Sequence, residues 1–261
     1  MYDGARKSII GRSGATDQNV RRPKYSHVST TCPSHNMSKR NKTFIGMLIA
    51  RTATQHLFIG LLNARHVPIV FVSGPAGTGK TLLACHVGAE HLALKKVERL
   101  VVTRPAVSVD EQHGFLPGTL EKKMEPWTRP VFDSLRRFYT PRTITQMNKD
   151  GIVEVCPLAY MRGRTFENSW IIADEMQNAT PNQMKMVLTR IGEGSKLVVT
   201  GDPRQHDRGF EDNGFVDFLN RLQKSSTVSI EHVEFTDADI VRHPVVKDVL
   251  EMYDSGDTPY L

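Results

Sequence analysis

One stretch of eight residues, Gly74 to Thr81 (GPAGTGKT), constrains the fold of this chain more than any other segment. It matches the pattern GxxxxGK[ST] in full, and it lies between an apolar run that ends at Ser73 and a helix-forming stretch that begins at Leu82. A strand that turns through glycines into a helix presents backbone N–H groups and the positive end of the helix dipole to a phosphate chain. The pattern therefore predicts a nucleoside triphosphate site, and we take ATP as its ligand. The residues expected to bind it are Gly74, Pro75, Ala76, Gly77, Thr78, Gly79, Lys80 and Thr81.

Within this loop two side chains have predicted roles. Lys80 is expected to contact the β- and γ-phosphates, and the Thr81 hydroxyl is expected to be a ligand of Mg²⁺. A second carboxylate-bearing segment, Trp170 to Glu175, is an apolar run that ends in Asp174 and Glu175. After such a loop, the Asp is expected to hold Mg²⁺ and the adjacent Glu to activate the attacking water. The pair favours hydrolysis over transfer to a bound acceptor, which is the reaction of P-loop kinases.

Short apolar runs alternate with helical stretches along the rest of the chain. Runs that are apolar on both faces are typical of parallel strands covered by helices, so we predict an α/β fold with a mainly parallel sheet and helices on both faces. The strands are expected at 69–72, 100–103, 152–155, 170–173, 197–200 and 228–233. The helices are expected at 44–64 (one or two), 80–94, 118–138, 181–191, 212–224 and 238–254, the last with a kink at Pro244.

The basic residues are unevenly distributed. Residues 1–43 contain nine of the 34 Lys and Arg residues but only two of the 28 Asp and Glu residues, so the net charge of +6 arises in this segment. We expect 1–43 to be a disordered basic tail, with nucleic-acid binding or a translation start at Met37 or Met47 as alternatives. Residues 44–261 are expected to form a single domain. Three separated cysteines, and no apolar run long enough for a signal peptide or a membrane span, predict a cytoplasmic protein.

Two further segments have polar residues at informative places. The run at 196–200 is followed by Gly201, Asp202 and Gln205, which are expected either to sense the γ-phosphate or to form an ordinary turn. Arg162 and Arg164 precede the run at 170–173. They are expected either to contact a nucleic-acid or nucleotide phosphate, or to anchor a loop.

Several long stretches resemble the PhoH family of P-loop ATPases over about residues 55 to 250. They are GPAGTGKT (74–81), TRPAV (103–107), GFLPGTLEKKMEPWTRPVFD (114–133), PLAYMRGRTFENSWIIADEMQN (157–178) and TPNQMKMVLTRIGEGSKLVVTGD (180–202). The resemblance implies a RecA-like fold, similar to the N-terminal core of superfamily 1 helicases. It places the strand that carries Gly201 and Asp202 between the strands of the two phosphate-site motifs.

The resemblance also implies roles for individual residues. Gln55 is at the position that contacts adenine, and Arg104 lies where helicases contact the nucleic-acid backbone. Gln177, Asp202 and Gln205 are placed where the family couples the γ-phosphate to that contact. Arg242 matches an arginine that would act as an arginine finger.

The sequence departs from the family pattern at Met176, where Ala is usual, and at 206–208 (HDR), where the family is more apolar. Met176 is not expected to remove activity, whereas 206–208 leaves the geometry of its loop open. About 60 residues follow Gly201, and we expect no second RecA-like core among them. The γ-phosphate arginine, Arg242 or Arg104, would then come from a neighbouring subunit, which predicts a homo-oligomer. A hexameric ring is the arrangement that the family resemblance suggests.

Three functions remain open from the sequence. The first is a Mg²⁺-dependent ATPase that acts on single-stranded RNA or DNA as a helicase or translocase. The second is a nucleotide-dependent regulatory or assembly switch without unwinding. The third, a small-molecule kinase, is disfavoured by Glu175.

Overall fold

The computed structural model describes residues 49–105, 129–205 and 213–241, together with 245 and 252. Its centre is a six-stranded parallel sheet with the strand order β3-β2-β4-β5-β1-β6. All six predicted strands are present, with ends shifted by one or two residues. Their bounds are β1 Ile69–Ser73, β2 Arg99–Arg104, β3 Val153–Pro157, β4 Ser169–Ala173, β5 Lys196–Gly201 and β6 Ile230–Glu234.

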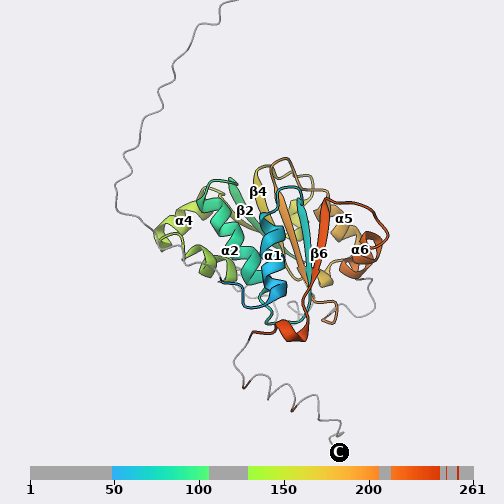
Figure 1. The fold of residues 1–261 in the computed structure, drawn as a ribbon. Coiled ribbons are helices and arrows are strands. Elements are labelled where there is room, and N and C mark those ends of the chain that lie inside the picture. Colours follow the sequence, from blue (N-terminus) through green and yellow to red (C-terminus); the bar gives the residue numbers. More distant parts are fainter. Residues whose placement is uncertain (1–48, 106–128, 206–212, 242–244, 246–251, 253–261) are drawn as a thin grey trace, which may run out of the picture. The chain divides into compact units, whose positions relative to one another are not determined.

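Helices cover both faces of this sheet, as predicted (Figure 1). On one face, α1 (Ala53–Asn63), α2 (Lys80–Ala93) and α4 (Pro141–Lys149) share a hydrophobic core with alternate strand residues such as Val70 and Val72. On the other face, α5 (Pro181–Leu188) and α6 (Gly214–Leu222) pack on the intervening residues such as Phe71. Because successive side chains of a strand point to opposite faces, one apolar run supplies both cores.

The order of the strands gathers the sequence motifs at one edge. β5 lies between β4 and β1, as the family resemblance implied. The carboxyl ends of these three neighbouring strands lead into Gly74, Asp174 and Asp202. In open parallel sheets ligands bind outside the carboxyl ends of the strands, so this edge is where a site is expected.

The helices agree with prediction less closely than the strands do. α4 was not predicted, although Thr140 caps its N-terminus and Pro141 occupies its first turn. Of the predicted helix at 118–138 the structure describes residues 129–138, of which 129–135 are helical and 136–138 form a turn. Of the predicted helix at 238–254, most residues lie outside the described part of the chain. Its described start is not α-helical, because a short 3₁₀ turn at Asp237–Asp239 is followed by extended backbone at Ile240. In the parts of the chain that the structure describes, no helix has both the length and the apolarity that a membrane span requires.

Candidate nucleotide-binding site

The loop between β1 and α2 is closely packed and relies on its glycines. Gly74 has φ +135°, and a Cβ added there would lie 2.4 Å from the carbonyl oxygen of Phe235. Gly79 is the N-cap residue of α2, with φ +88° and no side-chain cap. These left-handed backbone conformations are strained for residues with a side chain. Glycine at both positions is therefore required by the geometry of the loop.

The ammonium group of Lys80 lies against the loop from which it projects. Its Nζ donates hydrogen bonds to the carbonyl oxygens of Gly74 at 2.6 Å and Pro75 at 2.8 Å. Burial lowers the pKa of Lys80, and the nearby carboxylates, Asp202 foremost, partly offset this effect. The cation is thus held at the mouth of the loop between carbonyl oxygens and carboxylates.

Asp174 and Thr81, the two predicted magnesium ligands, are in contact. The Thr81 hydroxyl donates to Oδ1 of Asp174 at 2.7 Å, and the Thr200 hydroxyl donates to the same oxygen. A hydroxyl and a carboxylate are the hard oxygen ligands that Mg²⁺ prefers, and Mg²⁺ sites of nucleotide enzymes use few protein ligands beside phosphate oxygens and water. The donor set at this position therefore fits Mg²⁺.

Glu175 is held in place by its own backbone and by Gln177. It has the left-handed φ of +54°, an uncommon conformation for a non-glycine residue. Nε2 of Gln177 donates to Oε2 of Glu175 at 2.6 Å, and Oε1 of Gln177 accepts from the backbone N–H of Asp202 at 3.1 Å. Gln177 therefore connects the carboxylate after β4 to the loop after β5.

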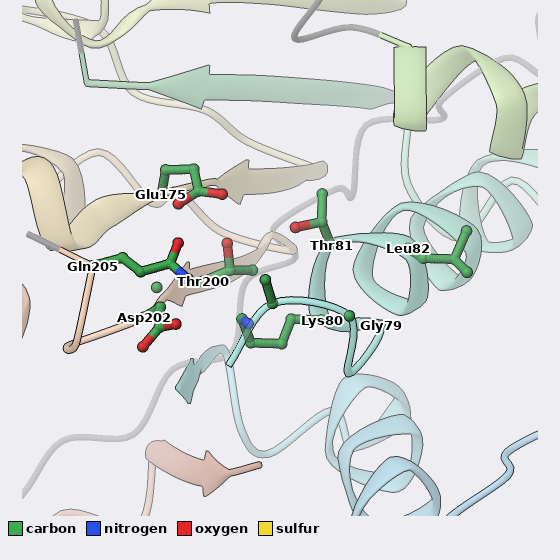
Figure 2. Close-up of a pocket in the computed structure, with 11 residues that line it drawn as sticks. Gly79, Lys80, Thr81, Leu82, Glu175, Thr200, Asp202 and Gln205 are labelled. Carbon is green, nitrogen blue, oxygen red and sulfur yellow. The ribbon is translucent and has the colours of Figure 1, made fainter. Parts of the chain in front are cut away.

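Several of these residues line one cavity of about 340 Å³ (Figure 2). Lys80 and Thr81 reach it from the start of α2, Glu175 from the loop after β4, and Asp202 and Gln205 from the loop after β5. The lining combines one lysine, two acidic residues and residues of the glycine-containing loop. This combination can bind a phosphate chain, hold a divalent cation and orient a water molecule for attack.

Gln55 lies beside the loop and is buried. Its Nε2 donates to the carbonyl oxygen of Thr78 at 3.0 Å, and its Oε1 accepts from the backbone N–H of Arg51 at 2.8 Å. Gln55 thus fastens α1 to the phosphate-binding loop. Its predicted contact with adenine remains a prediction.

The four arginines singled out from the sequence differ in their surroundings. Arg104 is half-buried at the end of β2, next to the strand that leads to Asp174. Arg164 forms a two-point ion pair with Glu154 of β3, with one bond of 2.7 Å, and its guanidinium carbon lies 4.5 Å from the ring centroid of Phe166. This pairing holds the pKa of Glu154 below its ordinary value. Arg164 therefore anchors a loop, which was one of its two predicted roles.

Of the other two arginines, the structure describes Arg162. Arg162 is exposed and lines a cavity with Asn182 and Met186. Arg242 lies outside the described residues, so its predicted role has no structural test.

Sequence reasoning missed two contacts at this site. One is the hydrogen bond from Thr200 to Asp174, which the position of Thr200 directly before Gly201-Asp202 would have suggested. The other is the ion pair between Arg204 and Asp237, 3.3 Å between Nη2 and Oδ1, which joins the loop after β5 to the turn after β6. No local pattern pointed to this second pair, since its members are far apart in the sequence.

The fold and the site define a P-loop NTPase with a RecA-like core. Residues 47–254 match the family described as PhoH-like protein. The chain belongs to the PhoH family.

Its similarity to curated relatives is extensive. It is 43% identical to the PhoH-like protein of Synechocystis, with 83% of this chain and 65% of that protein covered. It is 42% identical to the PhoH-like protein of Mycobacterium tuberculosis, with coverage of 85% and 61%. It is 40% identical to protein PhoH of Escherichia coli, with coverage of 79% and 58%. The chain thus spans about three fifths of the length of these relatives.

Among solved structures, the chain is similar to the large terminase of a thermophilic bacteriophage. The TM-score is 0.48 at 14% identity, over 77% of this chain and 48% of the terminase chain. It is also similar to the Pif1 helicase from Candida albicans, with a TM-score of 0.41 at 17% identity, over 79% of this chain and 44% of the helicase chain.

Proposed function

We propose that this chain is a Mg²⁺-dependent ATPase that acts on single-stranded RNA or DNA as a helicase-like or translocase-like motor. The observation that supports hydrolysis most directly is the position of Glu175, whose carboxylate lines the phosphate cavity next to Asp174. A carboxylate fixed by a neighbouring amide can orient a water molecule and accept its proton. Bound Mg²⁺ would neutralise charge on the phosphates, with Thr81 and Asp174 holding it.

The chain's own residues suggest how hydrolysis would be coupled to a partner. Gln177 contacts both Glu175 and the backbone of Asp202, so a shift of either loop changes the position of the carboxylate. Arg104 lies at the same edge of the sheet and is the proposed contact with the nucleic-acid backbone, with Arg162 as a second. This arrangement favours a motor over an isolated hydrolase.

The first prediction concerns nucleic-acid dependence. We expect ATP hydrolysis with Mg²⁺ to rise severalfold when single-stranded RNA or DNA is added, because the partner would complete the arrangement around Glu175. The measurement is steady-state phosphate release with and without each nucleic acid, with Lys80→Ala as the blank. A rate of phosphate release that changes with neither nucleic acid would contradict a motor and favour the nucleotide switch. An absence of hydrolysis in the assembled protein would contradict the ATPase itself.

The second prediction concerns assembly. The described residues form one nucleotide-binding core, and we propose that a homo-oligomer, with a hexameric ring as the expected form, supplies the γ-phosphate arginine across an interface. Arg242→Ala is then expected to lower turnover at least tenfold with little change in nucleotide affinity. Arg142→Ala on the exposed surface of α4 is the matched control. Light scattering during gel filtration gives the mass, and a fully active monomer would contradict this proposal.

A further inference from the structure

A second and larger cavity, of about 600 Å³, lies at the amino ends of the strands. Its walls include residues within three positions before β1, β2, β4 and β5, and residues at the ends of α1 and α2. Since all strands are parallel, this edge is opposite to the edge that carries the phosphate-binding loop. The cavity is therefore separate from the nucleotide site.

A buried ammonium group lies in the wall of this cavity. Lys196 is only 7% exposed, and its Nζ donates to the carbonyl oxygens of Leu61 at 2.6 Å, Ala64 at 3.0 Å and Val67. These bonds satisfy carbonyl groups at the carboxyl end of α1, but all three acceptors are uncharged. Among the described residues no carboxylate forms an ion pair with Lys196, and burial lowers its pKa to about 8. A buried charge without an anionic partner is costly and attracts an anion.

Two more cationic side chains line the same cavity as Lys196. Arg65 and Lys96 line the cavity with exposed side chains, and neither has an ion pair with a carboxylate of the described residues. Burial and the three nearby cations lower the pKa of His91, which lies in the same wall, to about 4. Its imidazole is therefore neutral at pH 7. Glu193 is the one carboxylate among the described residues that lines the cavity, so the positive charges outnumber it.

We propose that this cavity is a second ligand site, which binds a small phosphate-bearing anion between Arg65, Lys96 and Lys196. A doubly charged phosphate group matches the charge excess of the wall. Guanidinium groups bind phosphate oxygens through two parallel hydrogen bonds, and lysine ammonium groups add point charge. The Nζ donors of Lys196 are all engaged, so it contributes its charge, while Arg65 and Lys96 contribute hydrogen bonds.

Trp170 provides a fluorescence signal for ligand binding at this cavity. Trp170 is a fully buried residue of the cavity wall, and its ring centroid lies 4.7 Å from that of His91. The chain contains two tryptophans, so Trp127→Phe leaves Trp170 as the single reporter. Lys80→Ala in the same chain weakens phosphate binding at the P-loop. Titration of this double variant with pyrophosphate is expected to change Trp170 fluorescence in a saturable way. AMP in a parallel titration separates the two sources of the phosphate, a free polyphosphate or a nucleotide.

Charge variants test where the anion binds. Arg65→Gln with Lys96→Gln is expected to weaken binding at least tenfold. The matched control, Arg142→Gln with Lys149→Gln, removes two exposed cations from α4, outside the cavity, and is expected to change nothing. Glu193→Gln removes the opposing carboxylate and is expected to tighten binding at least twofold.

Two results would overturn the proposal. One is the absence of a saturable fluorescence change with both pyrophosphate and AMP. The other is equal affinity in the parent and in the Arg65 and Lys96 variant, or, if that variant does not fold, no tightening by Glu193→Gln. Neither result depends on ATP hydrolysis, so the second site and the ATPase can fail separately.

Discussion

Glu175→Gln is expected to lower ATP turnover by about 10²- to 10⁴-fold while nucleotide affinity stays within about threefold of the parent. The amide keeps the size of the side chain and its contact with Gln177, but it cannot accept a proton from water. The nucleotide contacts expected at Lys80 and Thr81 are untouched by the change. Phosphate release at saturating ATP and Mg²⁺ measures turnover, and a fluorescent nucleotide measures affinity.

Glu167→Gln is the matched control for this experiment. Glu167 is exposed and lies near the amino end of β4, whereas Glu175 follows its carboxyl end, so the same substitution is made at opposite ends of one strand. We expect Glu167→Gln to turn over ATP at the parent rate. Parent-like turnover in Glu175→Gln would exclude Glu175 as the general base. A parallel loss of affinity and turnover would assign it a role in shaping the loop.

Trp170→Ala is expected to lower the free energy of unfolding by about 3–5 kcal/mol. Trp170 has no exposed surface, contacts the α2 backbone at Gly88 closely, and donates its Nε1–H to the carbonyl oxygen of Ala84 at 3.1 Å. Truncation removes this packing and leaves the carbonyl without its side-chain donor. Because the residue fastens α2 to the sheet, the loss affects the core that supports the phosphate-binding loop.

Urea unfolding followed by circular dichroism measures this effect. Tyr160→Ala is the control, because Tyr160 is 62% exposed and its truncation is expected to cost less than about 0.5 kcal/mol. Similar unfolding midpoints for the parent and Trp170→Ala would contradict the assignment of Trp170 as a principal packing residue.

The sequence was sufficient for the sheet and for the positions of three candidate site residues at its strand and helix ends. The four inner strands, β2, β4, β5 and β1, are mainly buried apolar runs, so their positions are visible without knowledge of their neighbours. Lys80, Thr81 and Asp174 could be placed because local patterns fix their positions at strand and helix ends. Thr81 and Asp174 are in fact in contact.

The features that could not be predicted from the sequence depend on residue pairs that are distant in the chain or on weak local patterns. α4 was missed because only Ile144 and Met147 of its nine residues are buried, too few to produce a clear apolar period. The two roles considered for Arg164 could not be separated without the position of Glu154 on the neighbouring strand. The burial of Lys196 could not be predicted because its hydrogen-bond acceptors lie at the end of α1, far from it in the sequence.

The bare N-terminus of α2 has a consequence for how this protein would respond to its ligand. The other α-helices with described N-termini are capped by a side chain that accepts from a first-turn amide, at Thr52, Thr140, Thr180 and Asn213. The N-cap residue of α2, Gly79, has no side chain to form such a bond, and a side-chain cap is worth about 1 kcal/mol. A bound phosphate would fill this role, so the nucleotide would act as a removable cap. The thermal stability of the domain would then report nucleotide occupancy directly.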